Sequence, residues 1–426
     1  MSTERIHIAP SAKRLTGSLR DVGYSFESAV ADLVDNSITS GADEIKIDIL
    51  FAGRDSTVTI TDNGSGMDSE TVNESLRFGS RRSYGTGDLG RYGLGLKTAS
   101  LSQCRRIEVH SKQLGGSPEA RALDLDFIEA VDGWFISDIS GQYEDEAPVA
   151  LGDSGTTIMW KKLDRVLPAK SPDGGWARRR VEALPERLTS YLSMVFHRYL
   201  AGENVNPVSI QVNGESLTPW DPFARTEPAT KALNPDRFEI ESKGGSGFVT
   251  LQRYLLPTKS QFSSLAAYEE LSGLEKWNRQ QGLYIYRANR LVQWGGWAGI
   301  RTPDEHTKFA RVALDFDTDL DEAFNINVAK MRVSIPGELK KMLARPVNEL
   351  CILADAEYRR NEARPTAVQG PEEDAKSGGE RSESGFGVGL TLRTAAARTG
   401  NLAALNEIVE VIKSEMPEVA AYLGFD

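Results

Sequence analysis

Three glycine- and acid-rich signatures follow one another near the start of this chain, and their order constrains what it can fold into. They are ESAVADLVDN at 27–36, TDNGSGM at 61–67 and FGSRRSYGTGDLGRYGLGLK at 78–97, and a fourth segment, SGTTIMW, follows at 154–160. Each segment is weak evidence when it stands alone. The series indicates one ligand pocket that is assembled from a helix, a strand end and a glycine-rich loop.

The first signature predicts a helix that begins after Ser25, a favoured N-cap residue, and stops at Gly41. Asp32, Asp35 and Asn36 then lie at spacings i, i+3 and i+4, on one face. Their oxygens suit Mg²⁺, which takes oxygen ligands and keeps several waters. A carboxylate beside a metal-held phosphate can also orient or deprotonate an attacking water. The alternative is a solvated polar face of an amphipathic helix. The predicted helix is amphipathic because its apolar residues recur at helical spacing, at Ala29, Val30, Leu33 and Val34.

The second signature closes a predicted β-hairpin. Alternating apolar residues on both sides of a turn at 53–55 predict two strands, and the second strand ends at Asp62. Gly64 and Gly66 follow, and glycines let the backbone approach a flat ligand closely. A buried carboxylate at this point can accept a hydrogen bond from an exocyclic amine such as that of adenine. The alternative is an ordinary Asp-Asn-Gly turn.

The third signature is a glycine-rich loop that precedes Gly95, where an apolar helical pattern begins. Such a loop can serve as a mobile lid. Free N–H groups at the helix start, with Lys97 close by, would bind phosphate oxygens. The alternative is a flexible surface loop. The glycines of the loop are Gly79, Gly85, Gly87, Gly90 and Gly93.

In this order, DLVDN, DNGSG, GRYGLG and GTT resemble the N-box, G1-box, lid box and final threonine motif of the GHKL ATPases. That superfamily includes gyrase, the ninety-kilodalton heat-shock chaperones, histidine kinases and MutL. The resemblance covers residues 20–163, and DNSITSGAD and GRYGLGLKTAS are most similar to the Microrchidia (MORC) and MutL branches. It implies an α+β protein whose residues 1–165 form a Bergerat-fold ATP-binding domain, an α/β sandwich.

The resemblance also implies site residues for ATP and Mg²⁺. Asn36 would hold Mg²⁺, Asp62 would accept from the adenine amine, and Thr156 would support that contact through its hydroxyl or a water. Asp32 stands where hydrolytic members carry a catalytic Glu, and its carboxylate is one methylene shorter. A misplacement of about 1 Å can cost roughly 100-fold in rate. Glu27 is off this face and is not favoured as a substitute. The other implied ATP contacts are Gly64, Gly66, Met67, Gly90, Gly93, Gly95 and Lys97.

Composition bounds the class of protein. At 426 residues the chain should hold two or three domains. The start MSTERIHIAP has no apolar signal segment, and no run of about 18 apolar residues suggests a membrane span. Cys104 and Cys351 are far apart and predict no disulfide framework, and the histidines form no zinc pattern. We therefore expect a cytoplasmic protein without a membrane segment.

The net charge of −11 argues against a surface coated in positive charge for DNA, but not against a local basic track. The alternative for each basic cluster is a solvated face. The candidate clusters are Arg81–Arg82, Arg105–Arg106, Lys161–Lys162 and Arg178–Arg180.

Beyond residue 163 the pattern changes. A linker at 164–175 leads into a predicted helix at 176–200 that Pro185 should bend, and strands follow, with a turn at Asn213–Gly214. Segments at 247–257, 282–294 and 309–316 are rich in β-branched and aromatic residues and predict further strands. The runs QVNGESLTPWDPF at 211–223 and YIYRANRLVQWGGW at 284–297 resemble the transducer domain of MORC, MutL and gyrase proteins, and this resemblance implies such a domain at 174–362.

That second resemblance implies a further catalytic residue. Lys330, within FNINVAKMRVSIP, would reach the γ-phosphate of ATP; the alternative is a surface lysine between strands. A helix is predicted from Pro336. Residues 363–388 read as a disordered linker and 389–426 as a helical tail.

The function that the resemblance implies is an ATP-driven switch. ATP and Mg²⁺ would close the lid, two copies would associate, and hydrolysis would release them. The MORC and MutL branches imply DNA-associated work such as repair or chromatin-like remodelling. In a bacterial setting this implies a repair or phage-defence complex with a separate nuclease or helicase partner. The alternatives are a protein kinase of the histidine-kinase type and a chaperone that acts on protein clients.

Overall fold

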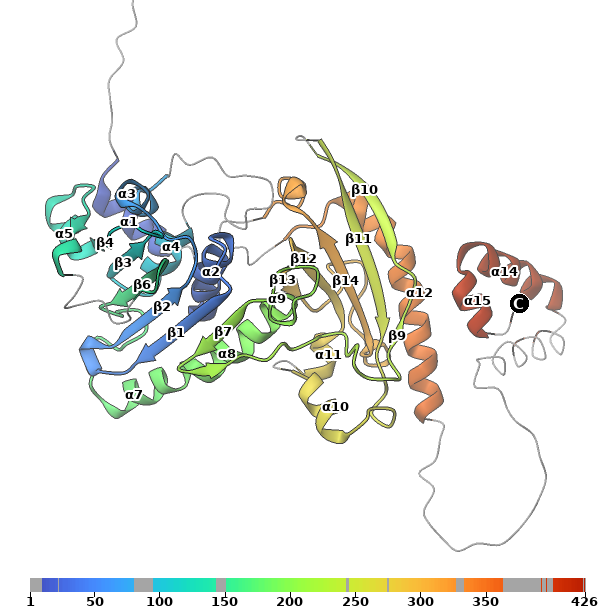
Figure 1. Cartoon of the computed structure of the whole chain (residues 1–426). Helices are drawn as coiled ribbons and strands as arrows, with labels where there is room; N and C mark the ends of the chain where they lie inside the picture. The colour runs from blue at the N-terminus through green and yellow to red at the C-terminus, as the bar shows by residue number, and fades with distance from the viewer. Residues whose placement is uncertain are drawn as a thin grey trace, which may run out of the picture.

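The protein is an α+β molecule with two sheets, their helices and a short helical tail (Figure 1), which confirms the expected class. The computed structural model describes residues 10–21, 23–79, 95–142, 151–242, 245–273, 276–326, 333–362 and 401–423, with Leu392, Ala396 and Phe425.

Within the described residues, the first sheet has eight strands in the order β5-β4-β3-β6-β2-β1-β7-β8. Neighbouring strands run antiparallel except β1 and β7, which are parallel. The strands are β1 (Glu44–Leu50), β2 (Thr57–Asp62), β3 (Arg106–Lys112), β4 (Glu119–Asp124), β5 (Ser137–Asp138), β6 (Gly155–Lys161), β7 (Ser209–Val212) and β8 (Glu215–Ser216).

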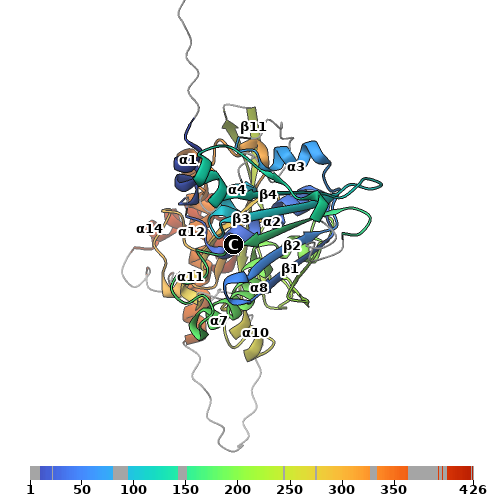
Figure 2. The ribbon, with the colours of Figure 1, turned by 90° about the vertical axis from the view of Figure 1, so that its left-hand side faces the viewer.

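Helices cover the apolar face of this sheet. Ile47 and Ile60 pair across β1 and β2, and both are buried in one core with Leu33 of α2. The turned view of Figure 2 places α1 and α3 above these strands and α7 and α8 below them. The helices are α1 (Ala12–Arg20), α2 (Phe26–Thr39), α3 (Ser69–Leu76), α4 (Gly95–Leu101), α5 (Leu125–Val131), α7 (Gly175–Glu182), α8 (Leu184–Val195) and α9 (His197–Ala201).

Local sequence signals explain several of these elements. The Ser25 hydroxyl accepts from the N–H of Ser28 at 3.1 Å and caps α2, and Gly41 lies just beyond its end with φ +81°. Asn213 and Gly214 both have positive φ at the expected turn between β7 and β8. The expected helix at 176–200 is divided into three, with Pro185 in the first turn of α8.

The first sheet extends past residue 165, where we expected its domain to end. β7 pairs with β1 and so extends this sheet. Buried side chains of α7, α8 and α9 belong to the core of the sheet, and the last buried residue of that core in the sequence is Leu217. The predicted start of the second domain at 174 therefore falls among elements of the first sheet. Periodicity in the sequence identifies a strand, but it does not say which sheet that strand joins.

The second sheet follows the order β10-β11-β14-β12-β13, with β9 paired to β11, and α12 packs against it (Figure 1). β12 and β14 are parallel, and the other pairs are antiparallel. Its elements are β9 (Lys231–Ala232), β10 (Asp236–Ser242), β11 (Gly245–Leu255), α10 (Leu265–Leu271), α11 (Lys276–Gln280), β12 (Gly282–Arg287), β13 (Arg290–Trp294), β14 (Ala310–Phe316) and α12 (Gly337–Glu362).

The tail consists of α14 (Leu402–Glu415) and α15 (Pro417–Leu423). Val419 of α15 is buried in the core of the second sheet, and the amide of Asn234 donates to Glu418 at 3.1 Å, so the tail docks on this part of the molecule. The expected linker at 363–388 lies outside the described residues. Among the described helices, none is long and apolar enough to cross a membrane. Cys104 and Cys351 are both buried as free thiols.

Helices α8 and α9 join the two sheets. The His197 Nε2 atom lies 2.8 Å from the hydroxyl of Tyr286, and the Tyr199 hydroxyl donates to the carbonyl of Ala288 at 2.8 Å. The guanidinium of Arg198 pairs with Asp315 and covers the ring of Tyr286. These contacts fix β12 and β14 of the second sheet against helices that belong to the first core.

Candidate functional site

Helix α2 holds Asp32 in the interior, where only 1% of the residue is exposed. The hydroxyl of Tyr24 donates to its Oδ2 atom at 2.7 Å. A Cβ atom added to Gly95 would lie 3.4 Å from the same oxygen, so the carboxylate faces the first residue of α4. Burial, and next the Asp32 charge, raise the pKa of Tyr24, so the phenol remains a donor. The carboxylate thus has a fixed position at the start of the helix expected to bind phosphates.

Asp35 points elsewhere, unlike our expectation of one shared face. Its carboxylate pairs with the guanidinium of Arg290 in β13 at 2.9 Å, and the two side chains are 0% and 2% exposed. Burial lowers the pKa of Arg290, but the charges of Asp35, Tyr191 and Asp32 together raise it by a larger amount. The pKa of Arg290 therefore lies above its ordinary value. Asp35 therefore fastens α2 to the second sheet, whereas the neighbouring Asn36 is half-buried.

Asp62 is the buried acceptor that we expected at the end of β2. Its Oδ2 accepts from the Ser37 hydroxyl at 2.8 Å, and its Oδ1 accepts from the N–H of Gly64 at 2.9 Å. Burial raises the pKa of this carboxyl, while the hydrogen bonds from Gly64, Ser37 and the main chain of Thr156 oppose that shift. The Ser37 contact joins this carboxylate to α2, the helix that also carries Asp32 and Asn36.

The glycines after Asp62 are required by close approaches within the protein. A Cβ atom on Gly66, which has φ +68°, would lie 1.8 Å from the carbonyl oxygen of Lys112. One on Gly64 would lie 2.1 Å from the Ser40 hydroxyl oxygen and 3.1 Å from Asp62 Oδ1. Any side chain here would displace the loop that presents Asp62. Their contact with a base stays a prediction.

The Ser111 hydroxyl of β3 ties two expected ligand contacts to the sheet. It accepts from the N–H of Met67 at 2.8 Å and lies 2.8 Å from the hydroxyl of Thr156. Thr156 also pairs with Asp62 across β6 and β2. Thr156 therefore lies beside Asp62 as expected; the part of its hydroxyl in binding adenine stays a prediction.

Lys97 lies on α4, two residues after Gly95, and is 2% exposed. Its ammonium donates to the carbonyl of Ser75 at 2.8 Å. Burial lowers the pKa of Lys97 to about 8, and the charge of Glu74 only partly offsets this. A poorly solvated ammonium of this kind gains an unusual amount from an incoming anion such as a phosphate.

Three of the residues expected at the site lie outside the described residues: Gly90, Gly93 and Lys330. The chain on both sides of Lys330 is described. Ile326 and Val333 are buried in the core of the second sheet, and the N–H of Val333 donates to Gln293 of β13 at 3.1 Å. Val333 is thus anchored to the strand whose Arg290 contacts α2.

Four side chains of the site were not predicted from the sequence: Tyr24, Ser37, Ser111 and Arg290. Ser37 directly follows Asn36 on the predicted helix, and this position next to an expected ligand is the signal that could have identified it. Tyr24, Ser111 and Arg290 carry no local signal, because their partners lie far away in the sequence or across a helix cap.

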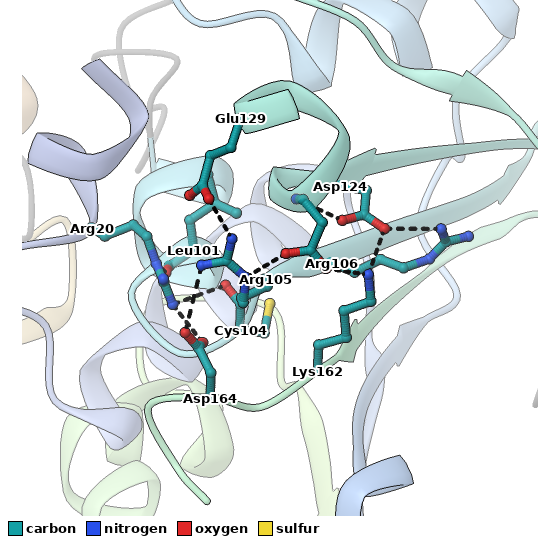
Figure 3. A network of polar contacts seen from close by, with 10 residues as sticks. Arg20, Leu101, Cys104, Arg105, Arg106, Asp124, Glu129, Lys162 and Asp164 are labelled. Carbon is teal, nitrogen blue, oxygen red and sulfur yellow. Dashed lines mark hydrogen bonds and ion pairs between the residues drawn. The ribbon is translucent and has the colours of Figure 1, made fainter. Parts of the chain in front are cut away.

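Two of the four basic clusters are neutralised by carboxylates (Figure 3). Arg105 pairs with Asp126 and Glu129, and Lys162 pairs with Asp124 and Asp126, at 2.5–2.9 Å. Arg106 and Lys161 both contact Glu108. Neither the cluster at 105–106 nor that at 161–162 is a free basic track. Arg81–Arg82 lies outside the described residues.

The described residues contain no group of three or more His, Cys, Asp or Glu side chains that could hold a metal ion. Mg²⁺ on a nucleotide needs little from the protein, because it keeps waters and binds phosphate oxygens. The half-buried amide of Asn36, one helical turn after Asp32, fits that requirement.

Comparison with known proteins agrees with this geometry. Residues 24–156 match the family described as histidine kinase-, DNA gyrase B- and HSP90-like ATPase. This segment is a GHKL-type ATPase domain. It contains every described residue of the candidate site except Arg290.

The ATPase domain is similar to named proteins of the MutL and MORC kind. DNA mismatch repair protein MutL of Chlamydia trachomatis is 34% identical over 121 residues, which are 27% of this chain and 21% of the relative. Protein MICRORCHIDIA 1 of Arabidopsis thaliana is 33% identical over 104 residues, 23% of this chain and 16% of the relative. ATPase morc-1 of Caenorhabditis elegans is 33% identical over 90 residues, 21% and 10% of the two chains. The chain thus matches about a fifth or less of the length of these relatives.

Proposed function

We propose that this protein is a Mg²⁺-dependent ATPase that works as an ATP-gated conformational switch, a dimerising clamp, in DNA-associated processes. The observation that carries the proposal is the position of α2 within the segment of the ATPase family. Its Ser37 donates to Asp62, and its Asp32 faces Gly95, two residues before the buried Lys97 of α4. Each of these side chains is buried and held by a named partner.

ATP binding would use both ends of this site. The Asp62 carboxylate, positioned by Ser37 and Gly64, would accept from the adenine amine. The buried ammonium of Lys97 and the N-terminal end of α4 at Gly95 would face the phosphates. The Asn36 amide oxygen would hold Mg²⁺, whose charge, when bound, neutralises phosphate oxygens.

Hydrolysis would use Asp32. The carboxylate, positioned by the Tyr24 hydroxyl, would orient a water and accept its proton while the water oxygen bonds to the γ-phosphorus. The bond from that phosphorus to the β–γ bridging oxygen breaks, which yields ADP and inorganic phosphate. Lys330 would neutralise charge on the transferred phosphoryl group. The anchoring of its flanks beside β13 supports this role.

The biological setting is proposed from the relatives. One is named a DNA mismatch repair protein, and two carry MORC names. We propose that closure around ATP brings two copies together, that DNA is the partner, and that any nuclease or helicase activity belongs to a separate protein.

Turnover of ATP labelled at the γ-phosphate tests the chemistry. We expect free phosphate to be released, and Asp32→Ala to slow release by roughly 10²–10⁴-fold while ATP still binds. Asp48→Ala, on the exposed side of β1, is the matched control and should keep the wild-type rate. Label that stays on the protein would indicate a kinase instead. A rate that responds to unfolded protein clients but not to DNA would favour a chaperone.

A further inference from the structure

A polar cavity in the described part of the protein is lined by neither Asp62 nor Lys97. It has a volume of about 480 Å³ and opens where the end of α1, the start of α2, the end of α4, the end of α7 and the start of α8 meet. Four arginines line it, against two carboxylates, Asp21 and Glu27. This excess of positive charge is notable in a chain of net charge −11. The arginines are Arg20, Arg165, Arg180 and Arg187.

Arg20 lines this cavity with a side chain that hydrogen bonds and an ion pair hold in place. Its Nε donates to the carbonyl of Leu101 at 2.7 Å, and its Nη2 pairs with Asp164 at 2.5 Å (Figure 3). Because the side chain is buried and held at several points, it needs no reordering to meet a ligand.

Arg165 and Arg187 stand at the rim. Arg165 pairs with Asp21 at 2.7 Å, and both side chains are about half exposed or more, at 48% and 66%. Arg187 is 65% exposed and contacts Glu27 at 2.6 Å. Solvent-exposed ion pairs are worth about 0–1 kcal/mol, so the Arg165 guanidinium can turn to a stronger anion at little cost. Glu27 is only 9% exposed, so Arg187 keeps this buried partner while it adds positive charge at the rim.

Arg180 completes the set. Among the described residues it forms no ion pair, and its guanidinium lies 5.4 Å from the ring centroid of Trp176. Arg179, the preceding residue on α7, does not line the cavity. Of the basic clusters at 105–106, 161–162 and 178–180, only the last contributes a side chain to this cavity.

These observations favour one ligand chemistry. Guanidinium groups present paired N–H donors that match phosphate oxygens. The volume falls within the range of about 300–1,000 Å³ that is usual for small-ligand pockets. We propose that this arginine-lined cavity binds phosphate groups, supplied either by the backbone of a nucleic acid or by a free phosphorylated molecule.

The cavity adjoins the ATPase site through one side chain. Tyr24 lines it, and its hydroxyl donates to Asp32. The proposal does not depend on ATP hydrolysis, however, because phosphate binding can be measured without nucleotide.

The test uses the full chain without nucleotide and two probes: a fluorescent double-stranded DNA oligonucleotide, and pyrophosphate. Arg180→Gln and Arg165→Gln should each weaken binding of the relevant probe about 10-fold. For DNA, the slope of log affinity against log salt should fall by about 1 for each lost phosphate contact. Arg179→Gln, with the same loss of charge on the same helix, should leave both quantities unchanged.

The outcomes separate the sources. Arginine-dependent binding of DNA identifies a nucleic-acid backbone, and arginine-dependent binding of pyrophosphate alone identifies a small phosphorylated ligand. Asp62→Asn, which alters the ATPase site, should leave both unaffected, so failure of the ATPase proposal would not alter this result. The cavity proposal is overturned if neither probe binds, or if Arg179→Gln and Arg180→Gln weaken binding equally.

Discussion

Asp62 is the residue on which nucleotide recognition should depend most. Asp62→Asn replaces a buried acceptor, held by Ser37 and Gly64, with an amide that can turn an N–H₂ group toward the adenine amine. Leaving a buried polar group without its partner costs about 1–3 kcal/mol, so ATP affinity should fall roughly 5–150-fold. Isothermal titration measures it. Asp48→Asn, on the exposed side of β1, serves as control. If the folded Asp62→Asn protein binds ATP with unchanged affinity, Asp62 is not the acceptor for the adenine amine.

Lys97 predicts a pH dependence of nucleotide binding. Burial holds its pKa at about 8, below the usual value for lysine, so the ammonium is present below that pH and is lost above it. Because a phosphate attracts only the charged form, ATP affinity should be constant below pH 8 and fall by up to about tenfold per pH unit above it. Titrations on both sides of this pH measure the slope. Lys97→Met should bind weakly at every pH; a wild-type slope in that variant would assign the titration to another group.

At the scale of elements, the contact between α2 and β13 links the two sheets. Arg290→Met would leave Asp35 buried without its cation, and the loss of one partner of such a pair costs about 3–5 kcal/mol. Denaturant unfolding should show this loss, and Asp35→Leu combined with Arg290→Met should restore much of it. Arg279→Met, an exposed arginine of α11, should change stability by no more than about 0.5 kcal/mol.

The functional measurement decides whether this contact is only structural. If the pair positions α2, folded Arg290→Met protein should also turn ATP over more slowly, because Asp32 lies one turn from Asp35 on the same helix. If Arg290→Met lowers the free energy of unfolding but leaves the rate of ATP hydrolysis unchanged, the pair contributes to folding alone.

The elements also show what could be predicted from the sequence. The cap at Ser25, the stop at Gly41 and the turn at Asn213–Gly214 follow from short-range chemistry, and the structure has them where expected. The pairing of β7 with β1, and that of Arg290 with Asp35, join residues more than a hundred positions apart. A single sequence carries no signal for such pairs, so the extent of the first sheet and the direction of Asp35 could not be foreseen.

At the scale of the whole molecule, the proposed clamp requires that ATP change how two copies associate. The glycine-rich sequence at 79–95 is the proposed lid, and contacts with the phosphates would hold it over the nucleotide. The second sheet would sense the same phosphates through Lys330, and the described residue Val333, three positions later, is anchored to β13. A ligand shifts such an equilibrium only by its differential affinity for the closed state.

We therefore expect the protein to be largely monomeric without nucleotide and to dimerise with a non-hydrolysable ATP analogue. Light scattering with and without the analogue measures the mass directly. Lys330→Ala should still bind ATP but hydrolyse it more slowly and dimerise less, because the contact between the second sheet and the γ-phosphate is lost. A dimer whose mass does not respond to the analogue would rule out gating while leaving ATP hydrolysis untouched. Full dimerisation of Lys330→Ala would place the coupling in the contact of Arg290 with Asp35 instead.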